Sequence, residues 1–186
     1  MYKAFKTLHI VGMALFLGGI FAHIAAGRVP GAETEPTAMV FARQAIDLAT
    51  RYVTVPGLGL TIVSGLLMAL LGPGGALKRR WQLAHMALAA VVVAVTFIVM
   101  IPVGREILGV ALAIAAGGKP IDAFAAVALP EHIWGGGNIV LILLAVAIGV
   151  AADSDLFRPG IPTRSRPPFR FEVGRRSEMK AAAIPT

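Results

Sequence analysis

Four long stretches without Asp, Glu, Lys or Arg constrain the fold of this chain more than any other feature. They cover residues 7–27, 52–77, 81–104 and 132–152. Because a helix rises about 1.5 Å per residue, each stretch can cross a hydrocarbon core of roughly 30 Å. The sequence Gly72-Pro73-Gly74-Gly75 is typical of a helix end, so the second span is predicted nearer residues 50–71.

The first stretch follows Lys3 and Lys6, a pattern that also begins cleaved signal peptides. Its apolar run is too long for a signal peptide, so we predict a membrane span there. Of the 186 residues, 57% are hydrophobic and only 15% are charged, with a mean hydropathy of +0.79. Charge this sparse does not solvate a soluble domain of this size, so the lipid bilayer must face much of the surface. The sequence therefore predicts an all-α fold, a four-helix transmembrane bundle over residues 1–152.

Basic residues are distributed unevenly between the two sides that four spans create. With the N-terminus inside, the inner segments hold most of the 17 Lys and Arg residues. Cytoplasmic segments carry such an excess, so we predict the inner (cytoplasmic) membrane with both termini cytoplasmic. The same placement argues against nucleic-acid binding in spite of the net charge of +7, because these residues form no basic face.

The remaining segments are predicted to lie outside the bilayer core. Residues 28–50 have mixed charge and some apolar spacing, which indicates a short interfacial helix. Residues 106–129 are Ala-rich and interrupted by Gly117-Gly118-Lys119-Pro120, which indicates an outer loop with amphipathic or re-entrant pieces. The Pro- and Arg-rich cytoplasmic tail at 153–186 has too little apolar surface to fold alone. We expect a partner redox subunit or a second copy of the chain to hold it.

Four histidines are the main candidate site residues, since an ionisable side chain inside a membrane is costly. His9 and His23 share nearly the same helix face, at depths that differ by roughly 21 Å. The predicted topology places His85 level with His9, and His132 level with His23. Imidazole pairs on facing helices hold the iron of haem in four-helix bundles. We therefore predict one or two haem b groups, between His9 and His85 and between His23 and His132.

Each of these assignments has an alternative. The histidines could form only interhelical hydrogen bonds, and His132 could be hydrated at the level of the lipid headgroups. Arg51, Arg79 and Arg80 could pair with haem propionates or simply anchor the helices at the interface. Two glycines beside the His9 stripe, Gly12 and Gly19, leave space for a porphyrin edge or for close helix packing.

Several short motifs resemble those of the HemJ-type protoporphyrinogen oxidases and related integral membrane proteins. Lys6-Thr7-Leu8-His9-Ile10 followed by Phe16-Leu17-Gly18-Gly19-Ile20 is similar to their first helix. Tyr52-Val53-Thr54-Val55-Pro56-Gly57 resembles the start of their second helix, and Trp81 with a polar residue four positions later resembles their third. The likeness covers residues 4–104 and implies haem b with His9 as a ligand. Those proteins have Lys where this chain has His85, and a His–His pair favours a six-coordinate electron-transfer haem.

Four functions are compatible with these features. The first is a b-type cytochrome that passes electrons within a membrane redox complex or to and from the quinone pool. No carboxylate lies inside the spans, so catalysis by this chain alone is not indicated. The second is HemJ-like oxidation of protoporphyrinogen IX. The third is copper handling resembling that of CopD-type proteins, with His and Met ligands. The fourth is a structural subunit whose histidines only hydrogen-bond. The absence of cysteine excludes iron–sulfur clusters and thiolate metal sites.

Overall fold

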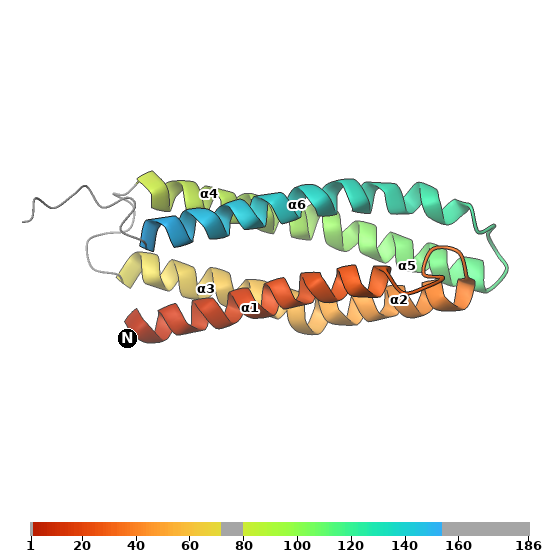
Figure 1. Ribbon diagram of the computed structural model, residues 1–186, viewed down its shortest axis with the longest axis horizontal. Helices are drawn as coiled ribbons and strands as arrows, with labels where there is room; N and C mark the ends of the chain where they lie inside the picture. The colour runs from red at the N-terminus through yellow and green to blue at the C-terminus, as the bar shows by residue number, and fades with distance from the viewer. Residues whose placement is uncertain (1, 72–79, 154–186) are drawn as a thin grey trace, which may run out of the picture.

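The computed structural model describes residues 2–71 and 80–153, which form helices joined by short connections (Figure 1). The elements in chain order are α1 (Tyr2–Gly27), α2 (Pro36–Ala49), η1 (Thr50–Thr54), α3 (Val55–Leu71), α4 (Arg80–Val95), η3 (Thr96–Met100), α5 (Ile101–Ala115) and α6 (Ala123–Asp153). The π-helical segments η1 and η3 join their neighbours into continuous helices. Four helices long and apolar enough to cross a membrane result, which confirms the predicted all-α four-helix fold. Arg79 and the tail after residue 153 lie outside the described residues.

The helices pair as two antiparallel hairpins (Figure 1). In the first hairpin α1 lies along α3, η1 and α2, and in the second α6 lies along α4, η3 and α5. The hairpins join each other through α2 and α5. The end of the molecule that holds Tyr2 and Arg80 is called the N-terminal end below. The opposite end, formed by α2, α5 and the start of α6, is called the cap.

The cap is more helical than the sequence pattern indicates. The sequence predicts an interfacial helix within residues 28–50, whereas α2 continues without a break through η1 into α3. It predicts an outer loop with amphipathic or re-entrant pieces over residues 106–129. In the structure α5 continues to Ala115 and α6 begins at Ala123, so the loop is limited to the short connection between them and the rest of the segment is helical. The two longest helices each have 36 residues, or about 54 Å, so they extend well beyond a hydrocarbon core of roughly 30 Å.

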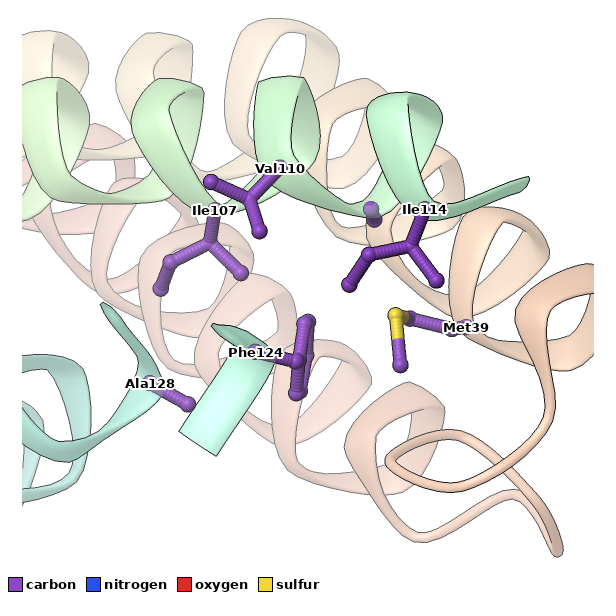
Figure 2. Close-up of a cluster of buried hydrophobic side chains, with 7 residues drawn as sticks. Met39, Ile107, Val110, Ile114, Phe124 and Ala128 are labelled. Atoms are coloured by element: carbon purple, nitrogen blue, oxygen red, sulfur yellow. The ribbon is translucent and has the colours of Figure 1, made fainter. Parts of the chain in front are cut away.

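Apolar packing explains why these segments are helical. The side chains buried in the cap come from α2, α5 and the start of α6 (Figure 2), and they are Met39, Ile107, Val110, Ala111, Ile114, Phe124 and Ala128. The apolar residues of α5 recur at helical spacing, which places them on one face against Met39 and Phe124. Burial of this face stabilises the helix more than its individual propensities do.

Between the cap and the N-terminal end, one layer of the bundle contains a buried side chain from each of the four spanning helices. These side chains are Phe16, Leu58, Val92 and Ile142. Phe16 is equally far along α1 from His9 and His23, so this layer separates the depths of the two histidines. The layer therefore divides the bundle interior into a part near the N-terminal end and a part beneath the cap.

Close packing of α1 depends on glycine. A Cβ atom added at Gly12 would lie 2.7 Å from the backbone nitrogen of Thr61, and one added at Gly19 would overlap the Thr54 side chain. Both glycines therefore allow α1 to approach its neighbours within the first hairpin. Of the two sequence interpretations, the structure confirms close helix packing.

Candidate functional site

His9 projects from α1 towards α3 and is held there through Nδ1. This nitrogen lies 2.9 Å from the backbone carbonyl oxygen of Thr61. Because a carbonyl oxygen only accepts, Nδ1 carries the proton and Nε2 carries the free lone pair. Ser64 Oγ, whose own proton goes to the carbonyl of Leu60, is a second acceptor 3.3 Å from Nδ1.

His85 is held in the same way in the second hairpin. Its Nδ1 lies 3.0 Å from the backbone carbonyl oxygen of Ala145 on α6. The same argument assigns the proton to Nδ1 and the lone pair to Nε2. Within the described residues, neither His9 nor His85 has a hydrogen-bond partner at Nε2.

A glycine lies beside each ring, four residues after the carbonyl that holds it. A Cβ atom at Gly65, four residues after Thr61, would lie 3.0 Å from His9 Cε1. A Cβ atom at Gly149, four residues after Ala145, would lie 3.5 Å from His85 Cε1. Each hairpin thus presents an imidazole from its first helix, oriented by a carbonyl and a glycine on its second helix.

The two imidazoles lie in parts of the bundle where the hairpins are not tightly joined. Within residues 2–71 and 80–153, the hairpin backbones approach closely along α2 and α5, and not along the parts of α1 and α4 that bear these rings. His9 and His85 both lie near the N-terminal end, seven residues after Tyr2 and five residues after Arg80, and their pairing stays a prediction.

The donor set limits what this pair could hold. In the described part of the chain, no cluster of three or more His, Cys, Asp or Glu side chains could surround a metal ion. Zinc sites, for example, use three or four protein ligands from these residue types. Haem needs only axial ligands, because the porphyrin provides the other nitrogens, so two neutral Nε2 atoms fit haem better.

His23 is held through its other ring nitrogen. Its Nε2 lies 3.2 Å from Thr50 Oγ1 and 3.3 Å from Thr54 Oγ1. Both hydroxyls donate their own protons to backbone carbonyls, so towards His23 they are acceptors. The proton of neutral His23 is therefore on Nε2, which is the opposite tautomer to that of His9.

His132 does not form a matched pair with His23. Its side chain is 59% exposed, and its Nε2 lies 3.7 Å from a carboxylate oxygen of Glu33 on the connection after α1. Both histidines line the same cavity, yet neither has the carbonyl-and-glycine arrangement found at His9 and His85. The structure thus separates the four histidines into two different environments.

The predicted propionate partners lie apart from one another. Arg80 is the first residue of α4, exposed, at the N-terminal end and on the same helix as His85. Arg51 lies in η1, where it forms an ion pair with Asp47 at 2.9 Å and remains 60% exposed. Of the two predicted propionate partners that the structure describes, Arg80 therefore lies at the same end of the molecule as His9 and His85, and Arg51 does not.

A cavity of about 1240 Å³ lies beneath the cap, between η1 and η3. Part of its wall is an ion pair between Arg43, which is buried, and Glu131, which is partly buried. The Arg43 guanidinium also lies 5.1 Å from the centre of the Phe124 ring. Two other buried polar side chains, Thr96 and Asn138, also line the cavity.

The sequence argument based on histidines misses these polar residues. Thr, Ser and Asn within an apolar span are themselves a signal of interhelical hydrogen bonding or of a site. Thr54, Ser64, Thr96 and Asn138 all lie inside the charge-free stretches. Attention to them would have indicated a second polar region at the depth of His23.

Comparison with known proteins gives no assignment. No protein-family model matches the chain, and neither a characterised protein nor a solved structure matches it.

Proposed function

We propose that this membrane protein is a b-type cytochrome that holds one haem b between His9 and His85. The observation that carries the proposal is the repeated arrangement of His, carbonyl and glycine in the two hairpins. Histidines that bind metals usually donate their second ring nitrogen to a carbonyl or carboxylate, which fixes the tautomer and the ring orientation.

The residues of the chain have three tasks in this proposal. The carbonyls of Thr61 and Ala145 orient the imidazoles and increase their basicity as ligands. The apolar helices exclude water, and this exclusion affects the reduction potential of a bound haem. Exposed Arg80 is available for a propionate at the N-terminal end. When bound, haem supplies reversible one-electron chemistry at iron.

The cellular arrangement is also part of the proposal. The excess of basic residues on one side favours the inner membrane of the cell with both termini cytoplasmic. The four charge-free stretches contain no carboxylate that could act as an acid or base. A chain of this kind with an electron carrier suits a subunit of a redox complex better than an independent enzyme. The electron partner would be such a subunit or the quinone pool.

The test is the haem content of purified chain after expression with sufficient haem. We expect one haem per chain by the pyridine haemochrome assay, and loss of that haem in His9→Ala and in His85→Ala. His132→Ala is the matched control and keeps its haem, because His132 is exposed and lies near Glu33. A correctly folded wild-type chain without haem would contradict the proposal.

The motifs around His9 favour a second candidate, HemJ-like oxidation of protoporphyrinogen IX. Rescue of a strain that lacks its own protoporphyrinogen oxidase would support it. Failure to rescue, with the chain well expressed and haem-loaded, would leave electron transfer as the function. Copper handling has less support, since the described residues contain no group of three or more His, Cys, Asp or Glu ligands and a copper site would depend on methionine.

A further inference from the structure

The cavity beneath the cap has the position and the walls of a site for a lipid-soluble molecule. Much of its wall is apolar and is formed by Phe16, Ile20, Val55, Phe97 and Ile139. Phe97 is also 49% exposed on the apolar outer surface of the bundle, so the cavity wall reaches the face that lipid covers. At about 1240 Å³, the cavity is larger than the roughly 300–1000 Å³ of an ordinary small-molecule pocket.

Three buried side chains in this wall each have a polar atom without a partner in the described part of the chain: Arg43 Nε, Thr96 Oγ1 and Asn138 Oδ1. Asn138 is 8% exposed and Thr96 is 6% exposed. Neither Asn138 Oδ1 nor Thr96 Oγ1 has a hydrogen-bond partner in the described part of the chain. Buried polar atoms are normally hydrogen-bonded, so several unpartnered atoms in one cavity wall indicate a ligand that completes them.

His23 adds a further polar atom. Because its Nε2 donates to Thr50 and Thr54, its Nδ1 keeps a lone pair and acts as an acceptor. The cavity therefore has two acceptors, Asn138 Oδ1 and His23 Nδ1, together with two donors, the Thr96 hydroxyl and Arg43 Nε–H. The complementary ligand is an apolar ring with two hydroxyl groups, which donate to the acceptors and whose oxygens also accept.

We propose that this cavity binds the head group of a lipid-soluble quinol, with its tail directed past Phe97 into the bilayer. The two quinol hydroxyls donate to the Asn138 and His23 acceptors, one quinol oxygen accepts the proton of the Thr96 hydroxyl, and the ring lies against the apolar wall. A second haem fits less well, because His23 Nε2 already donates to two threonines and His132 is exposed. The quinol site does not require haem at His9 and His85, so the quinol proposal and the haem proposal can fail separately.

Binding of decylubiquinol to the full chain in lipid nanodiscs tests the site, measured by calorimetry without oxygen. We expect saturable binding, about tenfold weaker in Asn138→Leu and in Thr96→Val, since each loses roughly one hydrogen bond. Gln82→Leu is the matched control, because Gln82 Oε1 is also buried without a partner and Gln82 does not line the cavity. Its affinity should equal that of the wild type.

Two further measurements separate binding from folding and from haem. The melting temperatures of Asn138→Leu and Thr96→Val should not fall, since the removed atoms have no partner in the protein. His9→Ala should bind decylubiquinol as the wild type does, even if it holds no haem. The proposal would be overturned by wild-type affinity in both cavity variants or by the absence of saturable binding to the wild type. It would also be overturned if a phospholipid occupied the cavity and the quinol did not displace it.

Discussion

The two polar regions of the bundle use the same residue type in opposite ways. At the N-terminal end, His9 and His85 donate from Nδ1 to backbone carbonyls and leave Nε2 with a lone pair. Beneath the cap, His23 donates from Nε2 to two threonine hydroxyls. The atom that holds each ring thus decides which nitrogen remains for a ligand. Histidines that look equivalent in the sequence therefore differ in the chemistry they can support.

The largest expected effect separates the two regions directly. His9→Ala should remove all haem, whereas His23→Ala should retain the full wild-type haem content. Of these two histidines, only His9 has an Nε2 without a partner in the described part of the chain, and His85 in the other hairpin has the same tautomer. Pyridine haemochrome measurement on both purified variants checks this. Equal losses in the two variants would show that the regions form one site.

The cap should respond strongly to loss of its buried ion pair. Arg43→Met leaves Glu131 partly buried without its partner, which we expect to cost about 3–5 kcal/mol of unfolding free energy. The double variant with Glu131→Gln should recover much of this loss, because no uncompensated charge remains. Denaturant unfolding in detergent measures both. A single variant as stable as the wild type would mean that water already solvates Glu131.

Alanine at the two glycines beside the rings should give different results. Gly65→Ala forces a shift of His9, whose Cε1 would lie 3.0 Å from the new Cβ, and should weaken haem binding about tenfold. Gly149→Ala has 3.5 Å of room at His85, so it should keep haem and gain about 0.5–1 kcal/mol of helix stability. Haem titration of both apo-variants provides the comparison, and similar affinities would argue against tight packing at His9.

The smallest expected effect concerns Ser64, the second acceptor at His9. Ser64→Ala leaves the Thr61 carbonyl bond in place, so haem affinity should fall only about threefold. A shift in the midpoint potential without a change in stoichiometry is expected in a redox titration. Complete haem loss would instead show that Ser64 is needed to orient the ring.

The spans and the predicted depth of the histidines follow from the sequence because both depend on the number of residues along each helix. A charge-free stretch has to be long enough for the bilayer, and His9 and His85 lie at similar distances from the predicted membrane surface. The cap does not follow in this way. Residues 106–129 contain the Gly-Lys-Pro interruption expected of a loop, and their helical state depends on packing against Met39 and Phe124 from distant segments.

The tautomers could not be predicted at all from residue types. They depend on which acceptor lies beside each imidazole, and the acceptors at His9 and His85 are backbone carbonyls, which every residue has. The threonines at His23 are visible in the sequence, and their spacing of four residues places them on one helix face. The sequence does not show that this face packs against His23 rather than against another part of the bundle.

The repeat of one imidazole setting in both hairpins has a consequence for biosynthesis. The carbonyl and glycine that hold His9 belong to the same hairpin as His9, and those that hold His85 belong to the other. Each imidazole setting is therefore complete once its own two helices have inserted, and the first is finished before the ribosome reaches the second. The cap then joins the two hairpins, so a cofactor held by both imidazoles would enter only after that step and would mark the end of assembly.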